Sequence, residues 1–117
     1  MKKVYYLSSC STCIRIIKEL KIRHEFIQQD IKNEKITPEQ LDEMKAMAGS
    51  YQVLFSRTAL KYKSMGLKNM ELTEEDYRNY ILEEYTFLKR PVFIVGKQIF
   101  IGNSKSNIAA LKEYLSM

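Results

Sequence analysis

The stretch VYYLSSCSTCIRIIKELK, residues 4–21, decides the fold of this chain. The run 4–7 is β-branched and aromatic, which is typical of a buried strand, and a pair of serines breaks it. From about residue 12 to 21 the apolar side chains recur along one face, which predicts a helix. Cys10 and Cys13 therefore stand where a strand gives way to a helix.

The flanking segments extend this pattern. The loosely alternating residues 25–31 predict a second strand, so the first 31 residues read β-α-β and imply a parallel pair with a right-handed crossover. In the last third, two apolar runs, 91–95 and 98–101, enclose a Gly-Lys pair and predict a β-hairpin with a two-residue turn. Ser104 or Ser106 then caps a final helix.

A helical insert of about 36–85 separates these two parts. Thr37 is a good N-cap followed by Pro38 at the first helical position, and Thr73 caps a second strongly patterned helix. A hairpin must pair antiparallel, whereas the first two strands run parallel. We therefore expect one domain over 1–117, an α/β fold with a four-stranded mixed sheet in the order β-α-β … β-β-α.

Composition limits the classes of partner. The chain has 117 residues, 45% of them hydrophobic, and a formal net charge of +5, which suits a soluble domain. A charge of this size is first of all typical of a well-solvated surface, and attraction of an anionic substrate or an acidic partner is the alternative. Lys61, Lys63 and Lys68 are too dispersed for a nucleic-acid patch, and no apolar run reaches the roughly 18 residues of a membrane span. The apolar run 4–7 is too short for a lipoprotein signal ending at Cys10, so we expect a cytoplasmic protein without direct nucleic-acid or membrane binding.

The two cysteines favour redox chemistry over metal binding. Together with the single histidine, His24, they supply three ligands at most, fewer than a structural zinc site needs, so we expect neither a metal nor a bound cofactor. A closely spaced pair in an intracellular protein is more often redox-active, although a pair of buried, inert cysteines is the alternative.

Cys10 is the candidate nucleophile because several groups can stabilise its thiolate. Helix N–H groups, the sulfur of Cys13, and a guanidinium from Arg57 or Arg90 all lower the pKa of a thiol. Cys13 lies three positions later on the same helix face, within disulfide reach, and is positioned to resolve a mixed disulfide. Pro91 starts a strand, where either a cis or an ordinary trans bond to Arg90 fits.

With these features in place, the chain resembles the arsenate reductase-like family, which includes the Spx-type regulators. The resemblance covers nearly the whole chain and rests on the Cys10 motif, on FSRT at 55–58 and on LKRPVFI at 88–94. It implies a thioredoxin-like fold with a helical insertion, and a cis proline at Pro91 beside the cysteine loop.

The resemblance also implies an activity. In family arsenate reductases the cysteine attacks arsenate, three arginines hold the oxyanion, and glutathione with glutaredoxin completes the cycle. Cys10 matches the nucleophile, and Arg57 and Arg90 match the first two arginines. We therefore expect a thiol-dependent oxidoreductase that acts on a small oxyanion or on a thiol or disulfide substrate, with glutathione and glutaredoxin, or thioredoxin, as reductant.

Three departures keep a second function open. The position of the third arginine falls at 102–104, which reads Gly-Asn-Ser; Tyr6 and Leu7 replace the usual histidine and asparagine; and Cys13 is additional. These departures favour the Spx-type branch. The alternative to an enzyme is then a redox-sensing regulator that binds the RNA polymerase α subunit, with a Cys10–Cys13 disulfide as its switch.

Overall fold

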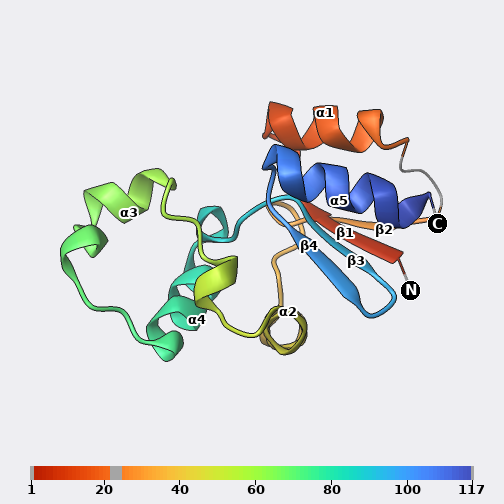
Figure 1. Ribbon diagram of the computed structural model, residues 1–117. Helices are drawn as coiled ribbons and strands as arrows, with labels where there is room; N and C mark the ends of the chain where they lie inside the picture. Colours follow the sequence, from red (N-terminus) through yellow and green to blue (C-terminus); the bar gives the residue numbers. More distant parts are fainter. Residues whose placement is uncertain (1, 22–24, 117) are drawn as a thin grey trace. The chain divides into compact units, whose positions relative to one another are not determined.

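The computed structural model of the protein describes residues 2–21 and 25–116. The chain divides into two compact units, Met1–Glu34 with Arg90–Met117 and Lys35–Lys89 (Figure 1). The expected helical insert, 36–85, falls within the second unit. The expectation of a single domain over the whole chain stays a prediction.

The first unit is built on a four-stranded mixed sheet in the order β2-β1-β3-β4. Its strands are β1 (Lys2–Tyr6), β2 (Ile27–Asp30), β3 (Val92–Val95) and β4 (Gln98–Ile101). Strands β1 and β2 run parallel, whereas β3 pairs antiparallel with both β1 and β4. The predicted α/β fold, a parallel pair followed by a hairpin, is therefore confirmed, and Gly96 turns the hairpin with a φ of 61°.

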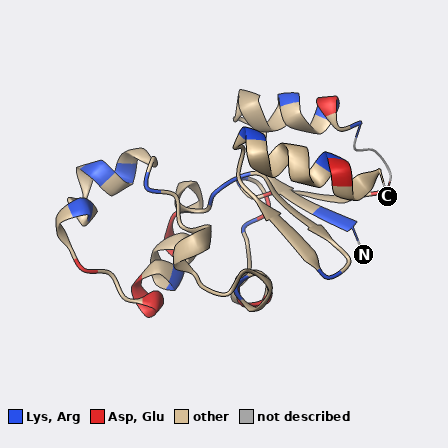
Figure 2. Ribbon diagram, viewed as in Figure 1, with Lys and Arg blue, Asp and Glu red and all other residues tan. Residues whose placement is uncertain are grey.

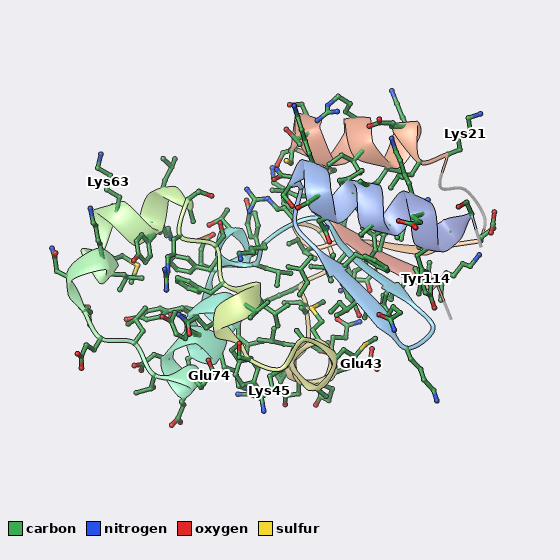
Figure 3. The ribbon with its side chains drawn as sticks, viewed as in Figure 1. Lys21, Glu43, Lys45, Lys63, Glu74 and Tyr114 are labelled. Atoms are coloured by element: carbon green, nitrogen blue, oxygen red, sulfur yellow. The ribbon has the colours of Figure 1, made fainter. Side chains whose placement is uncertain are left out.

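Two helices, α1 (Ser11–Glu19) and α5 (Lys105–Leu115), cover one face of this sheet (Figure 1). The core between these helices and the sheet is made of apolar side chains from the strands, the helices and the bend before β2: Val4, Ile16, Phe26, Phe93, Val95, Ile108 and Leu111. Tyr114, labelled in Figure 3, packs its ring against Phe100 of β4 with the ring centroids 5.6 Å apart. Burying each large apolar side chain contributes about 1.5–3 kcal/mol, so this core fixes α1 on the sheet.

The second unit is helical. It contains α2 (Pro38–Ala48), α3 (Leu60–Ser64) and α4 (Glu74–Glu83), with the 3-10 helices η1 (Gln52–Leu54), η2 (Leu67–Asn69) and η3 (Tyr85–Phe87). Thr37 and Thr73 cap α2 and α4 in reciprocal capping boxes. Helix α3 is shorter than the segment 58–65 that the sequence predicts, because the Thr58 hydroxyl lies 3.0 Å from that of Ser56 and caps no helix.

Aromatic rings form the centre of the second unit. Phe55 is 2% exposed and stacks on Phe87 with centroids 5.0 Å apart. Its ring also meets Tyr77 at 4.9 Å and Tyr62 at 5.9 Å. A backbone bridge between Phe55 and Leu88 joins the two segments that carry this stack. Such contacts make Phe55 the packing centre of the unit.

Charged side chains of both signs are interspersed on each unit (Figure 2). Lysines gather on α3 and η2, at positions 61, 63 and 68, but Lys61 forms an ion pair with Glu84 at 3.0 Å. Within 2–21 and 25–116, no helix combines the length and the apolar character that crossing a membrane requires.

Candidate thiol site

Cys10 lies between β1 and α1, as the N-cap residue of the helix. Its backbone N–H donates to the carbonyl oxygen of Leu7 at 2.9 Å, which closes a turn over two exposed serines. Its own carbonyl oxygen accepts the N–H of Ile14 at 3.2 Å, at the first turn of α1. The thiol of Cys10 is half-exposed and stands beside the first N–H groups of the helix.

The surroundings of Cys10 favour its thiolate. Partial burial by itself raises the pKa of a thiol, yet the pKa of Cys10 is lowered from its ordinary value. The backbone N–H and the thiol of Cys13 donate hydrogen bonds to the sulfur, the guanidinium of Arg90 adds positive charge, and the Thr12 N–H donates another bond. Each of these groups stabilises the charged form of the thiol. Of the two cysteines, Cys10 therefore has the larger thiolate fraction at neutral pH.

Cys13 has the opposite character. It is fully buried in the first turn of α1, and this burial raises the pKa of Cys13 to about 12. A hydrogen bond from the backbone of Leu7 opposes the rise, whereas the neighbouring Cys10 sulfur adds to it. Both cysteines are free thiols in the structure. At neutral pH Cys13 thus keeps its proton and donates it in a hydrogen bond to Cys10.

Arg90 and Pro91 also belong to the first unit, at the start of β3. The Arg90–Pro91 peptide bond is cis. The carbonyl oxygen of Pro91 accepts the N–H of Gly102 at 2.9 Å, which joins the start of β3 to the end of β4. The positive charge of Arg90 lowers the pKa of both thiols.

Arg57 lies in the second unit, in the exposed turn that precedes α3. The chain before it is well anchored, because the Ser56 N–H donates to the carbonyl oxygen of Phe87 at 2.6 Å. The Ser56 and Thr58 hydroxyls, on either side of Arg57, are hydrogen-bonded to each other. A role for Arg57 beside Cys10 stays a prediction.

The loop 102–104 carries no basic side chain, and two of its residues form hydrogen bonds with the first turn of α5. Gly102 has a φ of 89°, and its carbonyl oxygen accepts the side-chain amide of Asn107 at 2.8 Å. Ser104, one of the two caps that the sequence predicts, accepts the Asn107 N–H at 3.2 Å and begins α5. The loop therefore offers hydroxyl and amide groups in place of a third guanidinium.

No cluster of three histidine, cysteine or acidic side chains suited to a metal ion occurs in the part of the chain that the structure describes. His24, the third ligand considered from the sequence, lies outside the described residues.

The sequence pattern missed one residue of the site, Asp30 at the end of β2. Its Oδ1 atom accepts the backbone N–H of Ser8 at 3.1 Å, within the turn that leads to Cys10. This contact exists because β1 and β2 pair with Tyr6 opposite Asp30. The sequence shows a carboxylate at the end of the second strand. Its contact with the turn before Cys10 follows only from the register of β1 and β2.

Comparison with known proteins identifies a family that matches most of the chain. The ArsC family matches residues 5–111. A search of curated proteins found no match. A structure from Bacteroides fragilis, described as related to the ArsC family, is similar with a TM-score of 0.78 and 21% identity over 94% of this chain and 96% of that one.

Two further structures share the fold. An arsenate reductase (ArsC) related protein from Brucella melitensis has a TM-score of 0.69 and 20% identity, covering 99% of this chain and 95% of that one. An arsenate reductase from Vibrio cholerae has a TM-score of 0.72 and 16% identity, covering 95% of each chain. The family match spans both cysteines and the Arg90–Pro91 segment. The chain therefore belongs to the ArsC family, a thiol-based redox family with a thioredoxin-like fold.

Proposed function

We propose that this protein is a thiol-dependent oxidoreductase in which Cys10 is the nucleophile and Cys13 the resolving cysteine. The observation that carries this proposal is the placement of two free thiols at one helix start, Cys10 half-exposed at the N-cap and Cys13 fully buried in the first turn, and their opposite pKa shifts agree with it. A lowered pKa supplies the attacking thiolate, and a buried neighbour keeps its proton until the first sulfur has reacted.

The reaction on a disulfide balances within the pair of thiols. The Cys10 thiolate attacks one sulfur of the substrate, forms a new S–S bond and displaces the other sulfur, which takes up a proton. Loss of the Cys10 charge removes a group that holds the proton on Cys13. Cys13 then releases its proton to solvent, attacks the Cys10 sulfur and frees the second substrate thiol.

Two electrons have now passed to the substrate, and the protein holds a Cys10–Cys13 disulfide. Glutathione with glutaredoxin, or thioredoxin, returns two electrons and restores both thiols. We favour a disulfide over a small oxyanion as substrate because Cys13 already serves as the second thiol, whereas the loop 102–104 lacks a guanidinium. Arg90 suits either substrate, since its charge stabilises the attacking thiolate and attracts an anion.

Turnover by the purified protein tests the proposal. Insulin, the mixed disulfide of glutathione, and arsenate are offered in turn, each with glutathione and glutaredoxin or with thioredoxin and its reductase. We expect turnover of a disulfide, its loss in Cys10→Ser, and a trapped mixed disulfide on Cys10 in Cys13→Ser. The matched control is Ser11→Ala, which alters an exposed side chain of the same motif and keeps the activity. Absence of turnover on all three substrates with both reductants contradicts the proposal.

One observation favours a second function. Cys13 is present while no basic side chain occupies 102–104, a combination that suits a redox switch of the Spx type. In that case the Cys10–Cys13 disulfide changes binding to the RNA polymerase α subunit. Binding of the purified α subunit to oxidised and reduced protein, with Cys13→Ser as the form that cannot close the disulfide, tests it. Equal or absent binding in both redox states rules it out.

A further inference from the structure

Asp30 lies where the second strand ends beside the first. In the parallel pairing of β1 and β2, Asp30 stands opposite Tyr6, and the N–H of the next residue, Ile31, donates to the Tyr6 carbonyl oxygen at 2.9 Å. This register places the Asp30 carboxylate at the exit of β1, where the loop toward Cys10 begins.

The carboxylate is engaged on both oxygens. Oδ1 accepts the backbone N–H of Ser8 at 3.1 Å and that of Lys32 at 3.2 Å, and Oδ2 accepts the side-chain amide of Asn33 at 2.7 Å. Partial burial opposes the charge, but these bonds and one from the Ser8 hydroxyl lower the pKa of Asp30, so it is ionised at neutral pH. The two neighbours after the strand, Lys32 and Asn33, hold the carboxylate in the direction of Ser8.

Ser8 is the first of the two residues inside the turn that Leu7 and Cys10 close with a 2.9 Å backbone bond. Both serines in the turn are exposed, so apolar packing contributes little to its shape. The anchored residues on either side are Leu7, which is 4% exposed, and Cys10 itself. The bonds from Ser8 to Asp30 therefore supply a restraint inside the turn.

We propose that Asp30 is a positioning residue for Cys10. The Asp30 carboxylate holds the turn at Ser8 and thereby keeps the Cys10 sulfur beside the first N–H groups of α1. This inference rests on the proposed function only in naming Cys10 as the reacting sulfur. Asp30 contacts no reacting atom and acts through the backbone of Ser8.

The pH dependence of Cys10 alkylation tests this inference, because the direction in which the profile shifts distinguishes the loss of the Asp30 charge from the loss of the turn's restraint. Loss of the negative charge at Asp30 alone favours a nearby thiolate and moves the profile to lower pH. Loss of the turn's restraint withdraws the helix N–H groups from the sulfur and moves the profile to higher pH. Iodoacetamide is the probe, and mass spectrometry of the peptide that contains Cys10 gives the rate.

We expect Asp30→Ala to shift the profile to higher pH and to slow alkylation at pH 6 by about tenfold, the effect of losing one charge-assisted hydrogen bond. Asp30→Asn loses the same charge but keeps an oxygen that accepts the Ser8 N–H, so we expect its profile to lie at lower pH than that of Asp30→Ala. The matched control is Glu25→Gln, which removes one exposed negative charge from the turn that precedes the same strand and leaves the profile unchanged.

An Asp30→Ala profile that stays in place, moves to lower pH or coincides with that of Asp30→Asn overturns the inference. If Asp30→Ala does not fold, Asp30→Leu, which is neutral, similar in size and unable to accept the Ser8 N–H, takes its place in the comparison with Asp30→Asn. The assay contains neither substrate nor reductant, so a missing reductase activity in the wild-type protein contradicts the proposed function and leaves the positioning result standing.

Discussion

The thiol of Cys13 donates a hydrogen bond to the sulfur of Cys10 across the first turn of α1. Burial raises the pKa of the donor to about 12, while the same bond helps to lower the pKa of the acceptor. The two sulfurs are therefore unequal before any substrate arrives, and we expect Cys10 to react first.

Replacing the donor should affect Cys10 in two ways. In Cys13→Ala the hydrogen bond from the thiol is lost, so we expect the pKa of Cys10 to rise and alkylation at pH 6 to slow several-fold. The resolving sulfur is also lost, so a mixed disulfide accumulates on Cys10 and is seen as an added mass in the intact protein. If the Cys13→Ala variant carried no glutathione adduct after exposure to oxidised glutathione, Cys13 would not be the residue that resolves the mixed disulfide.

Arg90 should influence reactivity through its charge. In Arg90→Gln the positive charge beside both sulfurs disappears, and we expect alkylation of Cys10 at pH 6 to slow roughly threefold, the effect of a partly screened charge. Arg15→Gln is the matched control, because Arg15 lies exposed on the same helix, paired with Glu19 at 3.7 Å. Equal rates of Cys10 alkylation in the two variants would show that the charge of Arg90 does not influence the thiol.

The second unit should lose stability in acid through Asp42. Hydrogen bonds from Arg78 and from the Tyr51 hydroxyl, at 2.8 and 2.6 Å, lower the pKa of Asp42 from 3.8 to about 2. Because the folded pKa lies below the unfolded one, the stabilisation is present above pH 4 and is lost between about pH 4 and pH 2. Asp42→Asn should flatten that part of the curve of unfolding free energy against pH, measured with urea.

The neighbouring Glu74, labelled in Figure 3, provides a comparison for that experiment. Its carboxylate accepts the backbone N–H groups of Tyr51 and Gln52 at 2.7 and 3.1 Å. Glu74→Gln keeps an oxygen acceptor and leaves Asp42 with its partners, so the acid loss between pH 4 and pH 2 should persist. An equally steep curve in Asp42→Asn would contradict the assignment to Asp42.

Phe55 should be the most sensitive packing position of the second unit. Truncation in Phe55→Ala removes a ring that is 2% exposed and contacts three other aromatic rings, so we expect the free energy of unfolding to fall by about 3–5 kcal/mol. Leu60→Ala, at a side chain that is 89% exposed, should change it by less than about 0.5 kcal/mol. Urea unfolding of both variants gives the comparison, and similar losses would refute the packing role.

Much of the fold could be predicted because local patterns carry it. The two apolar runs on either side of a Gly-Lys pair predict the hairpin, and Thr37 and Thr73 mark two helix starts by their capping chemistry. Helix α3 starts later than expected because the Thr58 hydroxyl bonds to Ser56, a contact that a helix pattern does not include.

Spacing along the sequence predicts the candidate site where neighbours in sequence are neighbours in space, whereas the distant Arg90 is singled out by the family resemblance. Cys10 and Cys13 share one helix start, and the helix N–H groups lie there by geometry. The part played by Asp30 depends on the register of β1 and β2, and the contribution of the Leu7 backbone to Cys13 has no side-chain signal. Arg57 lies in a different unit from the cysteines, so neither sequence spacing nor local geometry defines its role.

The measurement that tests the central claim most directly is the pH dependence of alkylation of each cysteine in the reduced wild-type protein, resolved by peptide mass spectrometry. We expect Cys10 to react with an apparent pKa below that of an ordinary thiol and Cys13 to stay unmodified up to about pH 10, since its pKa is about 12. Equal reactivity of the two cysteines, or faster reaction at Cys13, would contradict Cys10 as the nucleophile.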